Sequence, residues 1–219
     1  MSEPLCIIVG YGAGVGQGIA LAFGEAGFRL GLIARNPAKL AEPLRQLTDA
    51  GIEAVLIAAD AGDENALTSA IGAISTDEST DVLVYNAVSP TFGKPSTLSA
   101  TQLVSDFQVD VVGALVAAQT VLPSMLSRRS GCILFTGGGW AHYPWDQASS
   151  IGIGKSDLRN LALTLAQELA DSGVRVGMIS IMGQVAPGTQ FDPGLIGHAF
   201  LKVYNQPPSE HEPELLFKG

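Results

Sequence analysis

Cys6-Ile-Ile-Val-Gly-Tyr-Gly-Ala-Gly-Val-Gly-Gln-Gly-Ile-Ala-Leu-Ala-Phe23 is the stretch that decides the fold. A short apolar run, a burst of glycines and apolar residues at helical spacing predict a strand, a tight turn and a helix. Glycines at positions 10, 12, 14, 16 and 18 leave the backbone open to a ligand. The start of the helix directs free N–H groups and its positive dipole end to the same place. The turn therefore suits a pyrophosphate, and an ordinary strand-to-helix turn is the alternative.

Composition limits the size of the core and the kinds of partner. The 219 residues are 47% hydrophobic with a mean hydropathy of +0.29, which is enough for one well-filled core. We therefore expect a single domain over residues 1–219. The net charge of −9 and the pI near 4.7 argue against a nucleic-acid partner and an anionic membrane surface, because both require a basic patch.

The cysteines and the absence of targeting signals predict a cytoplasmic location. Cys6 and Cys132 both lie in apolar runs of strand length, so reduced core thiols are favoured over a disulfide. We find no apolar segment of about 18 residues or more. Met1-Ser-Glu-Pro4 carries no basic start of a signal peptide.

Apolar runs of strand length alternate with amphipathic stretches of helix length. The expected strands are Leu5–Val9, Phe28–Ile33, Ala54–Ala58, Val82–Tyr85, Cys132–Phe135 and Val174–Ile181. The expected helices are Gly16–Ala26, Pro37–Ala50, Asn65–Ile74, Thr101–Arg128 and Ser149–Asp171. This alternation predicts an α/β fold, a doubly wound parallel sheet in a three-layer α/β/α arrangement.

Ligands of such a sheet bind beyond the carboxyl ends of the strands. Arg35 and Asn36 stand about 20 residues after the glycines, where an acid would bind the ribose of NAD and an arginine the 2′-phosphate of NADP. The acid is missing, so NADP(H) is favoured over NAD(H), and a solvated arginine at a helix start is the alternative. Asp60-Ala61 and Asn86-Ala87 follow the next strands and either bind adenosine or close turns.

With these motifs, the chain resembles the short-chain dehydrogenase/reductase family over nearly its whole length. Gly10-x-x-x-Gly14-Val15-Gly16 is similar to the family's TGxxxGxG turn, and Asn86-Ala87-Val88 to its NAG motif, with valine for glycine. Gly131–Gly139, the long helix through Lys155, and Gly173–Val176 resemble the family's second half. The resemblance implies a Rossmann-type fold, an NAD(P) cofactor, a small-molecule substrate and a homodimer or homotetramer.

The resemblance also indicates which residues hold the cofactor. Most lie in the glycine turn or directly after a strand. They are Gly10, Gly12, Ala13, Gly14, Val15, Gly16, Arg35, Asn36, Asp60, Ala61, Asn86, Ala87, Lys155, Gly183 and Val185. Lys155 would bond the nicotinamide ribose hydroxyls, and an exposed helix lysine is the alternative interpretation.

The catalytic half departs from the family pattern. In the family a tyrosine four residues before the lysine handles the proton, because the ammonium and the cofactor charge lower its pKa. That position is Ile151, the family's serine aligns with Gly138, and its helix asparagine aligns with Asp110. An isoleucine cannot exchange a proton and a glycine has no donor, so the usual carbonyl chemistry cannot use these positions. Met182-Gly183 also replaces the family's Pro-Gly.

Other residues are candidates for the lost roles. Tyr143, together with Lys155, forms the predicted catalytic set, although a loop tyrosine is also typical of a lid or an interface. His142 is a second candidate, suited to proton transfer near neutrality. We expect Ser149 to cap the following helix, as would Ser150. Asp110 is expected to be a hydrogen-bonded helix residue or a water anchor on the cofactor side.

Two further patterns carry no site. His142, His198 and His211 lack metal-ligand spacing, so no metal is expected. Gly152-Ile-Gly-Lys-Ser156 is similar to the end of a P-loop, but it lies inside an amphipathic helix and lacks the first glycine of that motif.

Two apolar stripes exceed what one face of the sheet can cover. They are Val109, Val112, Leu115 and Val116 in one helix and Leu158, Leu161, Leu165 and Leu169 in the next. We expect them to pair with a symmetry mate, and burial against the sheet is the alternative for about half of each.

Two functions therefore stand side by side. The first is an oxidoreductase that moves hydride to or from a small carbonyl or alcohol, with an unconventional group handling the proton. The second is a non-catalytic NADP(H)-binding or regulatory protein.

Overall fold

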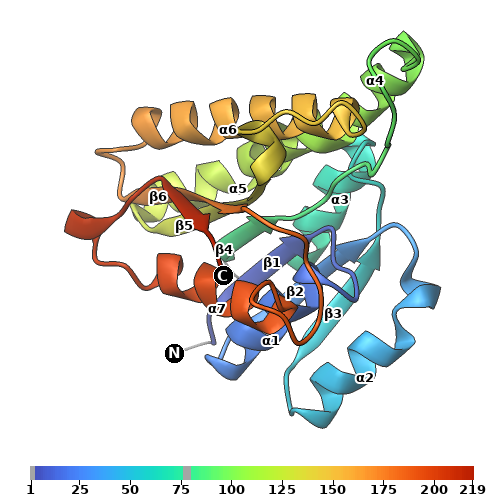
Figure 1. The fold of residues 1–219 in the computed structure, drawn as a ribbon. Coiled ribbons are helices and arrows are strands. Elements are labelled where there is room, and N and C mark those ends of the chain that lie inside the picture. Colours follow the sequence, from blue (N-terminus) through green and yellow to red (C-terminus); the bar gives the residue numbers. More distant parts are fainter. Residues whose placement is uncertain (1–2, 76–79) are drawn as a thin grey trace.

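A seven-stranded parallel sheet in the order β3-β2-β1-β4-β5-β6-β7 forms the centre of the computed structural model (Figure 1). The structure describes residues 3–75 and 80–219, so Met1 and Ser2 of the expected N-terminus lie outside it. The chain order reverses at β1, which pairs with both β2 and β4. The strands are β1 Leu5–Val9, β2 Arg29–Ala34, β3 Ala54–Ala58, β4 Thr80–Tyr85, β5 Gly131–Gly138, β6 Val174–Ile181 and β7 Glu214–Phe217.

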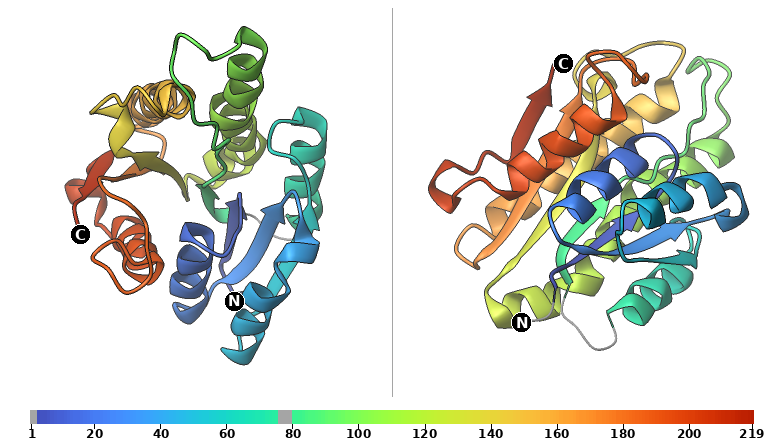
Figure 2. Two further views of the ribbon diagram at one scale, coloured as in Figure 1. Left: turned by 45° about the vertical axis from the view of Figure 1, so that its right-hand side comes forward. Right: turned by 90° about the horizontal axis from the view of Figure 1, so that it is seen from below.

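Helices cover both faces of the sheet, which confirms the predicted fold class (Figures 1 and 2). One face carries α1 Val15–Glu25, α2 Ala41–Asp49 and α7 Pro193–Tyr204. The other carries α3 Glu64–Ile74, α5 Gly113–Arg128 and α6 Ser149–Glu168, and α4 Ala100–Phe107 leads into α5 through a π-helical turn, Gln108–Val112.

The six expected strands form, with ends that shift by a few residues. The expected helix Pro37–Ala50 is wrong as one piece, because it divides into a 3-10 turn, Pro37–Lys39, and α2. Pro43 explains the division. Proline lacks an N–H and is tolerated in the first turn of a helix but not in its interior, and α2 begins at Ala41.

Two elements near the C-terminus were not anticipated. Helix α7 packs against α1 so closely that a Cβ at Gly18 would lie 1.8 Å from the Pro193 carbonyl oxygen, and one at Gly197 would lie 2.0 Å from the Gly18 oxygen. Strand β7 adds in parallel to β6, although the sequence suggests only a short tail. Both depend on contacts with distant segments, which local patterns do not reveal.

The two cysteines are free and fully buried, as expected for reduced core thiols. Burial raises the pKa of Cys132 to about 12 and that of Cys6 well above its ordinary value. Their thiols are therefore protonated at neutral pH and unreactive.

One expectation about hydropathy needs correction. Within the described residues, the continuous helix Ala100–Arg128 is long and apolar enough to cross a membrane by length and composition. A single such helix is weak evidence, since the core helix of a soluble protein passes the same test. Its α5 part contacts β4, β5 and α3, so its apolar residues are accounted for by packing on the sheet.

Burial within one chain accounts for much of the apolar stripes. Leu158, Leu165 and Leu169 are buried in the monomer, whereas Leu115 is 37% exposed. The remaining members are half-buried, so the expected pairing with a symmetry mate remains a prediction.

Candidate functional site

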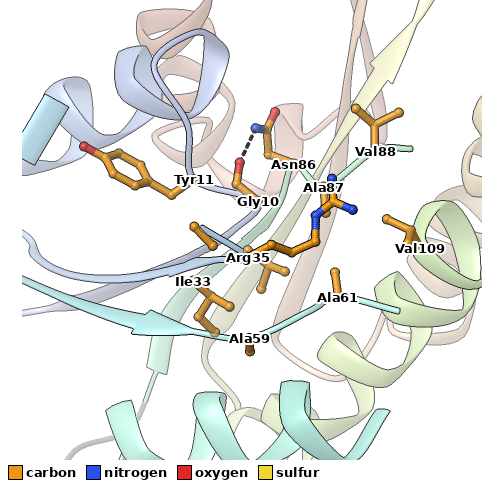
Figure 3. A pocket seen from close by; sticks show the side chains of 12 residues that line it. Gly10, Tyr11, Ile33, Arg35, Ala59, Ala61, Asn86, Ala87, Val88 and Val109 are labelled. Atoms are coloured by element: carbon orange, nitrogen blue, oxygen red, sulfur yellow. Dashed lines mark hydrogen bonds between the residues drawn. The ribbon is translucent and has the colours of Figure 1, made fainter. Parts of the chain in front are cut away.

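A cavity of about 220 Å³ opens at the carboxyl ends of β1, β2, β3 and β4 (Figure 3). This is the edge at which the strand order reverses, where α/β sheets bind their ligands. The lining residues are Val9, Gly10, Tyr11, Ile33, Ala34, Arg35, Ala59, Ala61, Asn86, Ala87, Val88 and Val109. Most are apolar, and the long polar side chains among them are those of Arg35 and Asn86.

Gly10 allows β1 to end against the neighbouring strand. Its φ of +85° suits glycine, and a Cβ there would lie 2.4 Å from the backbone nitrogen of Ala87. The N–H groups of Gly10 and Tyr11 both donate to the carbonyl oxygen of Ile33, at 2.9 and 3.0 Å. The Asn86 side-chain amide donates to the Gly10 oxygen at 2.9 Å, so β2 and β4 hold the turn from two sides (Figure 3).

The outer part of the glycine turn is open. A Cβ at Gly12 or at Gly14 would meet nothing within 4 Å, and Ala13 is exposed. Val15 and Gly16 begin α1, and the N–H of the next residue, Gln17, donates to the Gly12 and Gly14 oxygens at 2.8 and 3.0 Å, so that the N–H groups left for a ligand are those before it. The turn thus leaves open space at a helix N-terminus, and the binding of an anion there remains a prediction.

Tyr11 anchors this turn to the helices behind it. Its hydroxyl donates to Gln17 Oε1 at 2.6 Å, and the Gln17 amide donates to the Pro43 oxygen at 3.2 Å. The ring points away from Arg35 in Figure 3, and burial raises the pKa of its hydroxyl to about 12. This positioning role was not apparent from the sequence, because it depends on the approach of α2.

Arg35 follows β2 and is exposed. Figure 3 shows its side chain extended along the cavity toward Ala87. It has no hydrogen-bond or ion-pair partner in residues 3–75 and 80–219. A free guanidinium at this place is suited to an anionic group. Asn36 is also exposed and begins the 3-10 turn without a side-chain cap.

The residues after β3 divide between two roles. Ala61 lines the cavity beside Ala87. Asp60 lies outside the lining residues, and its Oδ1 accepts from the Gly62 N–H at 2.9 Å, which closes a local turn. The carboxylate therefore has a structural partner whether or not a ligand also contacts it.

A chain of hydrogen bonds connects Lys155 to the cavity. Its Nζ donates to the Thr136 carbonyl oxygen at 2.7 Å, and the Thr136 hydroxyl donates to Asn86 Oδ1 at 2.9 Å. Lys155 is buried rather than an exposed helix residue. Burial lowers the pKa of Lys155 to about 8, against the opposing effect of Asp110.

Asp110 lies in the π-helical turn between α4 and α5 and is 2% exposed. Its Oδ1 accepts the backbone N–H of Ser89 at 2.6 Å, as expected for a hydrogen-bonded helix residue. Its Oδ2 is buried without a hydrogen-bond partner in the described chain. Burial raises the pKa of Asp110 to about 6, although the Ser89 N–H and the charge of Lys155 lower it.

A second carboxylate, Asp106, binds the loop after β4 to α6. It accepts hydrogen bonds from Ser89 Oγ, Thr91 Oγ1 and Gln102 Nε2 at 2.6 to 3.0 Å, and from Ser150 Oγ at 2.5 Å. Burial acts to raise the pKa of Asp106, but these hydrogen bonds lower it by more. The pKa therefore lies below its ordinary value, and the carboxyl stays ionised. The sequence contained no signal for this cluster.

The expected helix caps at the start of α6 are wrong. Ala148 occupies the N-cap, without a side-chain hydrogen bond. Ser149 Oγ instead donates to the Gly93 carbonyl oxygen at 2.6 Å, and Ser150 binds Asp106. Both serines are used to attach the loop after β4, which is why neither caps its own helix.

The aromatic loop after β5 lies at the surface. Tyr143 is 72% exposed and does not line the cavity. Its neighbour His142 bonds Glu214 at 2.9 Å, and that carboxylate also accepts from Arg159 and Ser180. The predicted catalytic role of Tyr143 remains a prediction, whereas His142 has a structural partner that ties the loop to β7.

Trp140, Trp145 and Phe92 form an aromatic cluster beside this loop. The two indoles stack with ring centroids 5.6 Å apart, and Phe92 meets both rings edge-on. The cluster joins the loop after β4 to the loop after β5, which also meet through the bridge between Gly93 and Ala148.

Ile151 and Gly138 are the residues that we align with the family's tyrosine and serine, and this alignment remains a prediction. Ile151 is 4% exposed in the first turn of α6. A Cβ at Gly138 would lie 3.8 Å from Cγ of Lys155, which is ordinary contact. Gly183 follows β6, and the Phe191 ring packs so closely against it that an added Cβ would lie 2.1 Å from that ring. Val185 packs against the part of the core that lies on the α1 and α7 side of the sheet.

No three His, Cys, Asp or Glu side chains gather at one point within the described parts of the chain.

Residues 5–190 match the sequence profile described as short chain dehydrogenase. The chain belongs to the short chain dehydrogenase family. This confirms the resemblance, and it assigns the chain to a family of NAD(P)-dependent oxidoreductases that bind a nicotinamide cofactor.

Relatives and solved structures agree with the family. An uncharacterized oxidoreductase of Staphylococcus aureus (strain USA300) is 24% identical over 206 residues, which cover 94% of this chain and 83% of that protein. The 2,3-dihydro-2,3-dihydroxybenzoate dehydrogenase of Escherichia coli (strain K12) is 31% identical, covering 79% of this chain and 66% of that protein. The crystal structure of a metagenomic short-chain oxidoreductase in complex with NADP has a TM-score of 0.89 and 24% identity, covering 99% and 97% of the two chains. This likeness confirms the fold.

Proposed function

We propose that this short-chain dehydrogenase binds NADP(H) in preference to NAD(H) and moves hydride to or from a small carbonyl or alcohol. The observation that carries the cofactor preference is Arg35, a guanidinium without a protein partner in the described chain, beside a cavity whose lining includes no acidic side chain. NADP differs from NAD by a phosphate on the adenosine ribose, and a free guanidinium favours that group.

The residues present fit a dinucleotide. The open cradle of Gly12–Gly16 would hold the pyrophosphate, and Arg35 with Asn36 would hold the 2′-phosphate. The sites predicted for adenosine are Asp60, Ala61, Asn86 and Ala87, and those predicted for the nicotinamide end are Lys155, Gly183 and Val185. When bound, the nicotinamide supplies or accepts the hydride.

Proteins similar to this chain support the proposed cofactor and substrate class. The metagenomic oxidoreductase described above is in complex with NADP, and the Escherichia coli relative is named 2,3-dihydro-2,3-dihydroxybenzoate dehydrogenase. An alcohol or carbonyl substrate for this chain follows by analogy with that name.

Calorimetric titration with NADPH and NADH tests the cofactor preference. We expect tighter binding of NADPH, and Arg35→Ala should weaken NADPH binding by about 10- to 100-fold while leaving NADH unchanged. Arg45→Ala is the matched control, because Arg45 is an exposed arginine on α2 that pairs with Glu42 and Asp49. Equal affinity of wild type and Arg35→Ala for NADPH would contradict the proposal.

The second candidate is a non-catalytic NADP(H)-binding protein. Ile151 and Gly138 favour it, because neither side chain can exchange or donate a proton at the family's catalytic positions. Hydride exchange between NADPH and a panel of aldehydes, ketones and quinones separates the two functions. Turnover that Tyr143→Phe abolishes would assign the proton to Tyr143, and tight NADPH binding without any turnover would support the regulatory role.

We also propose that two or four copies associate through α5 and α6. Leu115, Leu126 and Ile153 are exposed apolar side chains on these helices. A monomer in light scattering at micromolar concentration would remove this proposal. The cytoplasmic location is likewise a proposal, supported by the two free buried cysteines.

A further inference from the structure

Two ionisable side chains of opposite charge are buried behind the cavity. Asp110 is 2% exposed and Lys155 is 8% exposed. They come from different elements, the π-helical turn and α6, which lie in contact. At Gly154, directly before Lys155, a Cβ would lie 2.4 Å from Oδ2 of Asp110. The carboxylate therefore lies against the backbone that carries the lysine.

The hydrogen bonds of this pair are incomplete. Oδ2 of Asp110 is buried and accepts nothing from the described residues, although a buried carboxylate oxygen is costly to leave unpaired. Lys155 uses one of its three ammonium protons in the bond to Thr136. Each group affects the other's charge, yet they form no ion pair within 4.0 Å in the described chain.

Asp106, one helical turn earlier, shows the contrast. Its carboxylate accepts from four side chains, so its oxygens are occupied and it acts as an attachment point. Asp110 has one backbone donor and one free oxygen. Of the two carboxylates, Asp110 is the one built to gain and lose a proton.

We propose that Lys155 and Asp110 together take over the proton transfer that the family's tyrosine performs. This inference rests on the proposed function, which supplies the hydride. In the reducing direction the carbonyl carbon gains the hydride, the C=O π electrons move to oxygen, and that oxygen takes a proton from Lys155 Nζ. Because the two groups are not within hydrogen-bond distance, a bridging water carries the carboxyl proton of Asp110 to the neutral amine, and the resulting carboxylate regains a proton from solvent. The oxidation of the alcohol reverses these steps.

The surroundings suit such a transfer. Burial brings the pKa of Lys155 down to about 8 and that of Asp110 up to about 6, so both groups exchange protons near neutrality. The other titratable groups that face Asp110 are Asp106 from α4 and Tyr85 from β4. The Tyr85 hydroxyl donates to the Val109 oxygen, and burial raises its pKa, so it stays protonated.

Carbon-13 NMR titration of the carboxyl groups in the cofactor-free protein gives the first test. The Asp110 carboxyl should titrate near pH 6, about two pH units above the ordinary value of an aspartate. Lys155→Met should move the Asp110 midpoint further upward, because it removes the positive charge that favours the carboxylate. An Asp110 that titrates with the exposed aspartates, or that ignores Lys155→Met, would overturn the pair.

NADPH-linked reduction gives the second test. Asp110→Asn should lower kcat by about 100-fold and remove the limb of the pH profile near 6, while NADPH affinity changes less than two-fold. Lys155→Met should abolish turnover. Full activity of Asp110→Asn with an unchanged pH profile would overturn this inference alone.

The two proposals fail in different ways. A wild-type chain that binds no NADPH defeats the proposed function and this inference with it. A wild-type chain that binds NADPH but reduces no carbonyl overturns the proton transfer and the proposed hydride transfer, and leaves only the proposed cofactor site.

Discussion

The ammonium nitrogen of Lys155 lies 2.7 Å from the carbonyl oxygen of Thr136. The Thr136 hydroxyl in turn bonds Asn86, and the Asn86 amide bonds the carbonyl oxygen of Gly10. One asparagine side chain therefore connects the ends of β1, β4 and β5. The glycine turn and the lysine predicted for the nicotinamide end are thus held in a common framework.

The first prediction concerns this asparagine. Asn86→Ala leaves the Gly10 oxygen without its side-chain donor and the Thr136 hydroxyl without its acceptor, so it should lower the free energy of unfolding by about 2 kcal/mol. Urea denaturation measures the loss, and NADPH affinity should fall as the turn loosens. Thr136→Val, the matched control, removes one of the two bonds and should cost about half as much. Equal losses in the two variants would contradict a bridging role.

The second prediction separates two glycines of the same turn. Gly10→Ala should lower the free energy of unfolding by about 2 kcal/mol or more, because its φ is +85° and its Cβ would collide with the Ala87 backbone. Gly14→Ala should change stability by less than about 1 kcal/mol, since its Cβ would meet nothing. The methyl group added by Gly14→Ala would nevertheless occupy the space in the glycine turn that is proposed to hold the pyrophosphate.

Thermal unfolding with and without NADPH distinguishes these effects. Gly14→Ala should keep the melting temperature of the free protein and lose most of the NADPH-induced stabilisation. The same stabilisation in Gly14→Ala as in wild type would show that no phosphate lies at this turn.

The third prediction is a pH dependence of stability. The pKa of Asp110 is about 6 in the folded protein and about 4 in an unfolded chain. The folded state then binds more protons than the unfolded state between these values, so the contribution of Asp110 to the free energy of unfolding falls as pH rises from about 4 to about 6. The loss reaches at most about 3 kcal/mol.

Comparison with Asp110→Asn isolates this contribution, because carboxylates such as Glu214, whose pKa is lowered, change stability in the opposite direction. Urea denaturation from pH 4 to 7 should show wild type losing stability relative to Asp110→Asn as pH rises. Parallel curves would contradict the prediction, because they would mean that the pKa of Asp110 is the same in the folded and unfolded states.

The fourth prediction restores the family's catalytic pair. Gly138→Ser should fold normally, because a Cβ there makes ordinary contact with Lys155. Ile151→Tyr fills a buried position and should cost about 1 to 3 kcal/mol. The double variant should reduce simple aldehydes with NADPH faster than wild type, since the scaffold for both residues is intact. Ile151→Phe with Gly138→Ser is the control, as it adds the ring without the hydroxyl, and equal rates in the two double variants would refute this prediction.

The residues that line the cavity could be predicted to lie together because their positions are encoded locally. Gly10 and Asn86 follow apolar runs, and a parallel sheet places the residues that follow its strands along one edge. Arg35 could be placed beside that edge by counting from the glycines. The structure brings all three to one cavity.

The proton-handling half could not be predicted in the same way. Asp110 is visible in the sequence as a departure from the family, but its free buried oxygen depends on the π-helical turn and on the approach of Gly154. Ser150 was expected to cap α6 and instead binds Asp106, because the loop after β4 folds onto that helix.

The sequence by itself determined the alternation of strands and helices and the open glycine turn, since apolar periodicity and missing side chains act over a few residues. Only the tertiary structure decided the burial of Lys155, the attachment of β7 through Glu214 and the exposure of Tyr143. These features arise from contacts between segments far apart in the chain. Their free energy depends on which side chains come into contact in the folded protein and on the loss of hydration when those side chains are buried.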